Sequence, residues 1–387
     1  MFALNGRPSL LLAAALAVAM PGFLVTACSG QAGAGAARND AVAAVGRAAT
    51  AGKAPPAARR PAAVRAVRLL AQAAQAAIVT SYQGEEVVTR WSGDGRTVLV
   101  SDVWHASGGR TVTQTLDAGA SFSSQPYLSS DADGQAPEGV LGVTFPLVQL
   151  LKTHYIVAYA GAGSADDRTA QVVEAWRADG SLAARFWLDD ATRLPLERQV
   201  FDSAAHVIGQ DVFIKVRFAG QGSAAANVAP ASAGASAARQ RLWTGPLSQA
   251  QLLALRASGW QVPPQLPGGL SLFTAAETKA STGIVLDLGY SDGLSVVSVF
   301  EQRGNLAAKL AGWRRTTVAG HVVFAAEPDL RSLTWSGRGM VYTVMADAPA
   351  QTIDAVVGAL PHDGPTGFWK RMSRGLNRLA SWANPFH

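Results

Sequence analysis

Alternating apolar and polar positions fill two long stretches of the chain and predict antiparallel β-strands. In the first stretch, "YQGEEVVTRW", "RTVLVSDVWHA" and "RTVTQTLDA" are separated by glycine-containing turns. "AQVVEAWRADGSLAARFWLDDATRLPLERQVFD" then predicts a meander, with a tight hairpin at "ADG" and a further turn at "DDATRLP". "HVIGQDVFIKVRF" predicts one more strand. The second stretch predicts strands at about 283–300, 321–326 and 340–346.

Helical spacing predicts helices at four places in the chain. The block from Ala63 to Ala77 predicts the first helix of the folded part, and "PLVQLLKTHYIVAYAG", from Pro146, predicts a short helix that leads into a strand. Ser248 and Gln251 have the spacing of a capping box, which predicts that a helix begins there. A last helix is expected at 349–359.

Two segments rich in small residues predict linkers. Residues 29–62 contain alanine, glycine, arginine and proline with almost no large apolar residues, so burial cannot offset the cost of ordering them. Residues 219–239 have a similar composition. The predicted organisation is a signal peptide at 1–28, a tether at 29–62, a first domain at 63–218, a linker at 219–239, a second domain at 240–361 and a tail at 362–387.

Composition leaves several classes of partner open. The chain has 387 residues, of which 49% are hydrophobic and 16% charged, so it can bury sizeable cores. Its net charge of +6 suits nucleic acid, an anionic membrane surface or an acidic protein.

The N-terminus predicts export. Arg7 precedes the apolar run "SLLLAAALAVAMPGFLV", which Pro21 and Gly22 interrupt, so a secretory signal is favoured over a membrane span. "VTAC" follows and resembles the bacterial lipobox, in which the cysteine, here Cys28, is acylated. The alternative is an ordinary signal peptide with an incidental cysteine. An exported, lipid-anchored protein on the extracytoplasmic face of the bacterial cytoplasmic membrane would not meet cytoplasmic nucleic acid, and one cysteine cannot form a disulfide framework.

The stretch "GYSDGLSVVSVF" places Tyr290, Ser291 and Asp292 together, which raises the question of a catalytic cluster. A nucleophile elbow needs a strand before the serine and a helix after it. Here apolar strand-like runs lie on both sides, and Asp-Gly between such runs predicts a hairpin turn. We therefore expect a turn, with Tyr290 and Asp292 as candidates for contact with a partner.

Other candidate catalytic or metal groups lack the required spacing. Asp189 and Asp190 are neighbours whose side chains would face opposite sides of a strand, so turn capping is the better interpretation. The histidines form no metal-binding motif; they are His105, His154, His206, His321, His362 and His387. The sequence therefore predicts no catalytic site, no metal site and no cofactor, and the chain is not expected to be an enzyme.

The C-terminal tail combines an apolar stripe with a basic face. On a helical wheel, Phe368, Met372, Leu376, Leu379 and Trp382 share one side. The pattern is typical of a helix lying in a membrane interface. A helix that packs on its own domain, or one that meets an acidic partner, remains an alternative. The candidates for membrane contact are Phe368, Trp369, Lys370, Arg371, Arg374, Arg378 and Trp382.

Several stretches, in this order, resemble the RseB/MucB family of extracytoplasmic regulators. They are "ADG", "ARFWLDDATRLPLERQVFD", "LPGGLSL", "YSDGLSVVSV" and "VYTVMADAPAQTIDAVVGAL", which together extend over roughly residues 65–360. The resemblance implies an α+β fold, with an N-terminal LolA-like curved antiparallel sheet (a half-barrel) with helices and a smaller C-terminal α/β domain. The lipobox, the tether and the basic tail depart from the family's pattern.

The resemblance also implies a function. The chain would bind the extracytoplasmic part of a membrane anti-sigma factor between its two domains, and would modulate an envelope-stress sigma factor. A lipid or lipoprotein ligand in an apolar cavity of the first domain would change the affinity for that partner. The alternative is a lipid or lipoprotein carrier of the LolA-like class, and a hydrolase is the third hypothesis.

Overall fold

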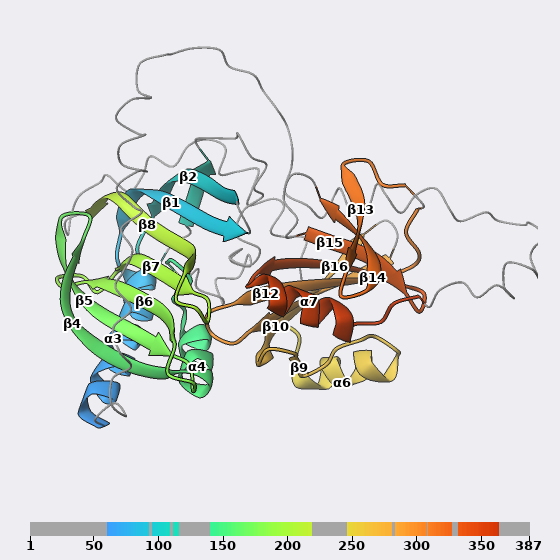
Figure 1. The fold of residues 1–387 in the computed structure, drawn as a ribbon, viewed down its shortest axis with the longest axis horizontal. Coiled ribbons are helices and arrows are strands. Elements are labelled where there is room, and N and C mark those ends of the chain that lie inside the picture. Colours follow the sequence, from blue (N-terminus) through green and yellow to red (C-terminus); the bar gives the residue numbers. More distant parts are fainter. Residues whose placement is uncertain are drawn as a thin grey trace, which may run out of the picture.

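Two antiparallel β-sheets, each with its own helices, make up the folded part of the chain (Figure 1). The computed structural model describes residues 60–92, 95–108, 111–115, 140–218, 246–280, 283–307, 309–326 and 332–363. The predicted signal peptide with Cys28, the predicted linker and the tail beyond Asp363 lie outside these residues.

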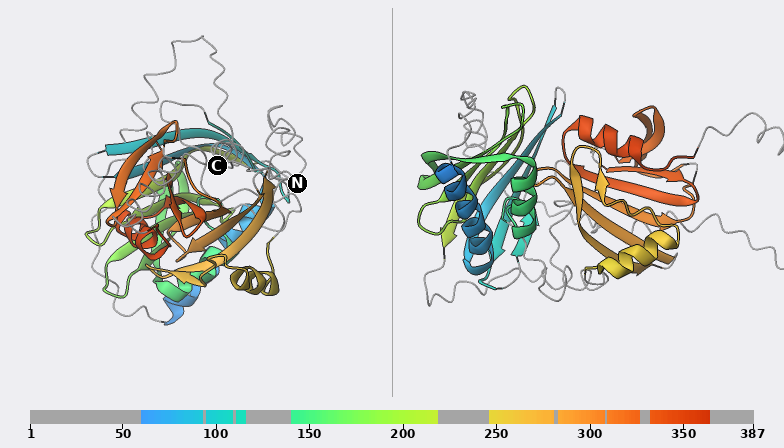
Figure 2. Two further views of the ribbon diagram at one scale, coloured as in Figure 1. Left: turned by 90° about the vertical axis from the view of Figure 1, so that its right-hand side faces the viewer. Right: turned by 90° about the horizontal axis from the view of Figure 1, so that it is seen from below.

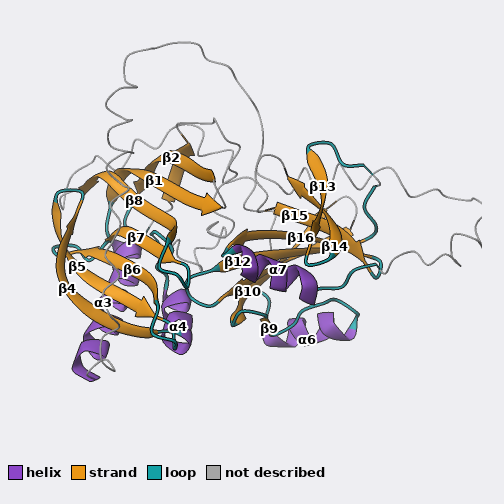
Figure 3. Ribbon diagram, in the orientation of Figure 1, coloured by secondary structure: helices purple, strands orange, loops and turns teal. Residues whose placement is uncertain are grey.

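The first sheet is strongly curved (Figures 1 and 3). In the described chain it has eight strands in the order β3-β2-β1-β8-β7-β6-β5-β4, and all neighbours are antiparallel. The strands are β1 (Tyr82–Ser92), β2 (Gly95–His105), β3 (Thr111–Thr115), β4 (Ile156–Ala165), β5 (Arg168–Trp176), β6 (Leu182–Asp189), β7 (Pro195–Phe201) and β8 (Val207–Phe218). This curved sheet with helices is the half-barrel that was predicted.

Helices α3 (Arg60–Val79) and α4 (Phe145–His154) pack together on one face of this sheet (Figure 2). By length and composition, Ala62–Val79 could cross a membrane. However, Leu70 and Ala73 are fully buried in a cluster with Val173 and Leu188 of the sheet. We therefore interpret α3 as a core helix. It begins at Arg60, slightly inside the segment predicted to be a tether.

The second sheet also has eight described strands, in the order β13-β14-β15-β16-β12-β11-β10-β9. The domain mixes helices and strands, as expected. All its strand pairs are antiparallel, so it is of the α+β type and not of the predicted α/β type. Its strands are β9 (Gln265–Leu266), β10 (Leu270–Ala280), β11 (Gly283–Ser291), β12 (Val296–Arg303), β13 (Trp313–Val318), β14 (His321–Ala326), β15 (Ser332–Gly337) and β16 (Met340–Asp347). Its helices are α6 (Gln249–Ala257) and α7 (Ala350–Ala359).

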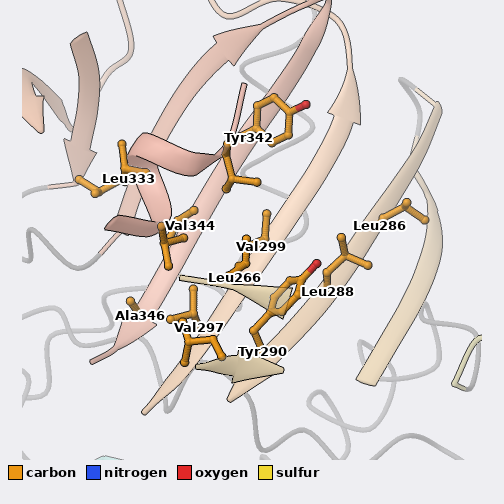
Figure 4. Close-up of a cluster of buried hydrophobic side chains, with 14 of the residues drawn as sticks. Leu266, Leu286, Leu288, Tyr290, Val297, Val299, Leu333, Tyr342, Val344 and Ala346 are labelled. Atoms are coloured by element: carbon orange, nitrogen blue, oxygen red, sulfur yellow. The ribbon is translucent and has the colours of Figure 1, made fainter. Parts of the chain in front are cut away.

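One apolar cluster joins α6, α7 and the second sheet. Leu252 of α6 and Val356 of α7 are buried in the same cluster as Tyr290, Leu288 and other sheet residues. Figure 4 shows Tyr290 and Leu288 within this cluster. The capping box that was predicted from Ser248 and Gln251 is present at the start of α6. Both amphipathic helices thus cover the same side of the sheet.

Candidate functional site at the domain interface

The "YSDGL" stretch forms the turn between β11 and β12, as predicted. Ser291 pairs with Val296 across the hairpin. The Asp292 carboxylate oxygen Oδ1 accepts hydrogen bonds from the backbone N–H groups of Leu294 (2.8 Å) and Ser295 (2.7 Å). The Ser291 hydroxyl accepts one from Gly293 N–H at 2.8 Å and donates one to Ser295 O at 2.7 Å. The polar groups of this cluster therefore hold a turn.

The tip of this hairpin inserts into the first domain. Leu294 is buried in the same apolar cluster as residues of α3, α4 and the first sheet. Arg198 of β7 donates from Nη2 to Leu294 O at 2.5 Å, and the Tyr155 hydroxyl donates to Asp292 Oδ2 at 2.6 Å. The stretch is therefore a contact between the two domains of one chain.

Gly293 is required at this contact for two reasons. Its φ of 99° is a conformation that residues with a side chain rarely adopt. A Cβ atom at this position would lie 2.3 Å from the backbone nitrogen of Leu151 in α4. The hairpin can approach α4 only because this residue has no side chain.

A second contact joins the domains at the end of β16. Arg90 of β1 donates from Nε and Nη2 to the two carboxylate oxygens of Asp347, both at 2.8 Å. Arg90 also donates from Nη1 to Asp211 of β8. Burial lowers the pKa of Arg90, but the carboxylates of Asp211 and Asp347 outweigh it and raise the pKa. The guanidinium therefore stays charged in a fixed bidentate geometry.

Buried charges lie on the helix-covered face of the first sheet. In the strand register, Arg198 lies opposite Phe186 of β6, which packs in the cluster with α3, and opposite Asp211 of β8. Asp211 lies opposite Val88 of β1, and Glu86 and Arg90 are two positions to either side of Val88. The side chains of Arg198, Asp211, Glu86 and Arg90 therefore share this face. Burial, followed by the nearby Asp211 charge, raises the pKa of Glu86 to about 8. Glu86 is therefore mostly neutral at pH 7.

A cleft of about 300 Å³ lies between the domains beside the hairpin. Three of its polar side chains, Tyr155, Arg177 and Asp292, are already bonded within the protein. Arg177, for example, donates to the carbonyl oxygens of Leu182, Phe201 and Asp202. His154 is different, because its buried Nε2 atom has no hydrogen-bond partner among the residues that the structure describes. The cleft is lined by His154, Tyr155, Arg177, Val200, Gly268, Asp292, Leu294, Ser295, Pro349 and Thr352.

The structure separates the two predicted contact residues. Asp292 lies at the domain interface and lines the cleft. Tyr290 lies in the core of the second domain, where its hydroxyl donates to Pro263 O at 3.0 Å and its side chain is fully buried (Figure 4). In this arrangement the ring of Tyr290 is out of reach of a partner. The predicted lipidation and membrane-contact residues, Cys28, Phe368, Trp369, Lys370, Arg371, Arg374, Arg378 and Trp382, lie outside the described residues.

Asp189, His321 and His362 have local structural roles. Asp189 accepts hydrogen bonds from Arg168 and from the backbone of Thr192, which is the turn-capping role that was predicted. His321 and His362 stack with ring centroids 3.8 Å apart. The described residues hold no group of three or more side chains placed to bind a metal ion.

Sequence reasoning missed the residues that make the polar contacts with the hairpin and with the end of β16, which are Tyr155, Arg198, Arg90 and Asp347. The available signal was a charged residue inside an otherwise apolar strand, as in "VVTRW" for Arg90. Such a residue is buried only when it is paired, so it indicates an ionic partner without naming it.

The described chain is thus a two-domain, antiparallel α+β protein with a cleft between its domains.

No protein-family model and no curated protein matches the chain. Solved structures are similar to it. MucB in complex with MucA(peri) is 18% identical over 77% of this chain and 100% of that chain, with a TM-score of 0.40. The MucA/MucB complex of Pseudomonas aeruginosa is 19% identical over 78% of this chain and 100% of that chain, also with a TM-score of 0.40.

A LolA superfamily protein from Nitrosomonas europaea is a further similar structure. It is 9% identical over 74% of this chain and 96% of that chain, with a TM-score of 0.17. All these likenesses concern the fold alone, and they are too distant to carry a ligand, a partner or an activity to this chain.

Proposed function

We propose that this chain is an exported, lipid-anchored regulator that binds the extracytoplasmic segment of a membrane anti-sigma factor in the cleft between its domains. The observation that carries the proposal is the "YSDGL" hairpin. It is the most specific of the motifs that resemble the RseB/MucB family, and its Asp292, Leu294 and Ser295 line the cleft. By binding there, the chain would modulate an envelope-stress sigma factor.

The chemistry of the cleft suits an extended peptide better than a reaction. Its acid, Asp292, is already bonded to Tyr155 and to two turn N–H groups. His154 Nε2, which lacks a partner in the described part of the chain, can bond to a peptide group of a ligand. A segment lying there would contact α4, the β11–β12 hairpin and the start of α7 at once. Affinity for the partner would then depend on how the two domains are docked.

Anchoring and lipid sensing complete the proposal. Cys28 would carry the lipid, and the tail residues from Phe368 to Trp382 would add contact with the membrane surface. A lipid or lipoprotein in the first domain would change affinity for the partner. The buried charges Glu86, Arg90, Arg198 and Asp211 on the helix-covered face mean that such a site would not be purely apolar.

Site-specific photo-crosslinking in membranes tests the proposal. A photoreactive amino acid replacing Thr352, which lines the cleft, should capture a single-span anti-sigma factor. The same amino acid replacing Leu253, which is 56% exposed on α6 and does not line the cleft, should not capture it. Equal capture at both positions, or capture at neither, would contradict binding in the cleft.

Lipids extracted from the same sample separate this function from that of a carrier. A lipid recovered together with the anti-sigma factor supports signal sensing. Lipids or acylated lipoproteins recovered without any anti-sigma factor at low salt would favour the lipid or lipoprotein carrier.

A further inference from the structure

Two arginines of the first domain hold the second domain at separate places. Arg198, on β7, bonds to Leu294 O in the β11–β12 hairpin. Arg90, on β1, bonds to Asp347 at the end of β16. In the order of the first sheet, β8 is the single strand between β1 and β7. A side chain of β8 that lies between the two arginines can therefore contact both guanidinium groups.

That position of β8 carries Asp211. Its Oδ1 atom accepts a hydrogen bond from Nη1 of Arg90, and its Oδ2 atom lies 3.6 Å from Nη1 of Arg198. The side chains of these three residues are at most 9% exposed. The recorded ion pairs of Asp211 in the described chain are all with these arginines of its own domain. Asp211 thus faces both interdomain contacts from one side.

Burial makes this arrangement sensitive to the loss of one member. A buried charge is tolerated only when it is paired, and removal of one partner leaves the other charge uncompensated. Without Asp211, Arg198 loses its only recorded ionic partner among the described residues, and Arg90 keeps only Asp347 of the opposite domain. Arg90 would still be bonded to Asp347 and to the carbonyl oxygens of Thr89 and Gln210, and Arg198 to Leu294 O, but neither guanidinium would keep the position that Asp211 gives it.

We propose that Asp211 is a positioning residue that couples the two interdomain contacts, so that the domains dock and separate as one event. Breaking the contact at Asp347 would leave Arg90 bonded to Asp211, Thr89 O and Gln210 O within its own domain, so that Arg90 and Asp211 shift together and the hold of Arg198 on the hairpin weakens. Loss of the hairpin contact would likewise displace Arg198 and, through Asp211, weaken the bond of Arg90 to Asp347. The effect on a cleft ligand rests on the proposed function, whereas the docking itself does not.

Distance measurements by double electron–electron resonance test the docking directly. Spin labels on Ser203→Cys and Leu253→Cys, both exposed, report the separation of the domains in the full chain carrying Cys28→Ser. The parent should give one narrow distance distribution. Asp211→Asn should add a broad second population, with at least about a fivefold rise in the ratio of separated to docked molecules. An unchanged narrow distribution would overturn the proposal.

Asp189→Asn is the matched control. Asp189 is also buried in the first sheet and also pairs with an arginine, Arg168, but that pair lies within one domain. Its variant should be destabilised and still give the narrow distribution. If Asp189→Asn separates the domains as much as Asp211→Asn does, the effect is one of general instability and the proposal fails.

A mutant cycle decides the question even if Asp211→Asn does not fold. Asp347→Asn and Leu294→Ala each weaken one contact, and neither changes Asp211. If the contacts are coupled, the ratio of separated to docked molecules in the double variant should differ by about fivefold or more from the value expected when the two single effects are multiplied. Additive effects would show two independent contacts. Because this readout contains no ligand, it can fail or succeed separately from the proposed function.

Discussion

The hydroxyl of Tyr155 lies 2.6 Å from Oδ2 of Asp292 and donates a hydrogen bond to it across the domain interface. The other carboxylate oxygen of Asp292 holds the turn between β11 and β12. Burial, followed by the charge of Asp292, raises the pKa of Tyr155 well above its ordinary value, so the hydroxyl keeps its proton. One carboxylate therefore shapes the hairpin and also fastens it to the first domain.

Replacing Tyr155 by phenylalanine should weaken the docking of the domains. The substitution leaves Asp292 with one unsatisfied oxygen, and a hydrogen bond to a charged group contributes about 1.5 kcal/mol or more. Urea unfolding should show a loss of about this size. Tyr159→Phe, which removes a hydroxyl bonded to Gln171 within the first domain, is the control, and it should leave interdomain distances unchanged. A Tyr155→Phe variant that docks and unfolds like the parent would contradict this role.

Gly293→Ala should separate the hairpin from α4. The new methyl group would meet the backbone of Leu151, in addition to the cost of a positive φ at a residue with a side chain. Gly259→Ala measures that backbone cost alone, because Gly259 has a φ of 91° and open space around it. Thermal unfolding should show a loss of about 1 kcal/mol for Gly259→Ala and a clearly larger loss for Gly293→Ala. Equal losses would mean that the hairpin moves aside at no cost.

The sequence could predict the hairpin because the signal is local. Asp292 and Gly293 lie between two apolar strands, and the turn depends only on these neighbours. The insertion of Leu294 into the other domain could not be predicted in this way. A leucine after a turn looks the same whether it meets its own domain or another.

The ionic contact was beyond prediction for a related reason. Arg90 and Asp347 are 257 positions apart, and no periodicity relates two strands of different sheets. Strands β13 and β15 were also missed, since "WRRTTV" and "SLTWSG" are short and mostly polar. Pairing with neighbouring strands supplies what their own sequences lack.

Glu301 should make the second domain less stable as the pH rises. Its side chain is fully buried, its Oε2 atom accepts only the Gln261 N–H among recorded bonds, and burial raises its pKa to about 8. Between about pH 4.5 and 8 the folded protein keeps a proton that the unfolded chain releases, so stability falls across this window.

Glu301→Gln removes this one titration. Glu86 and Asp287, whose pKa values burial also raises to about 8, continue to titrate in the same window. The slope of unfolding free energy against pH between 5 and 7 should therefore become shallower by about 1.4 kcal/mol per pH unit. Chemical denaturation at several pH values measures this slope. An unchanged slope would mean that Glu301 is ionised in the folded protein.

His362 should act in the opposite direction, at acid pH. Its ring lies between His321 and Trp335, with centroid distances of 3.8 and 5.0 Å, and its Nε2 donates to Val357 O at the end of α7. Burial lowers the pKa of His362, and the neighbouring His321 lowers it further. The unfolded chain therefore binds a proton at a higher pH than the folded protein does, so stability falls as the pH drops below about 6.5.

His321→Asn should raise the pKa of His362, because it removes the electrostatic effect by which the neighbouring imidazole lowers that pKa. Titration of the imidazole Cε1–H signals by NMR measures the change. His206→Asn is the control, since His206 is exposed and pairs with Asp202 in the first domain. If the pKa of His362 stays the same in both variants, burial alone lowers it and the stacked pair adds nothing. If it rises only in His321→Asn, the two rings repel each other on protonation and loosen the end of α7 in acid.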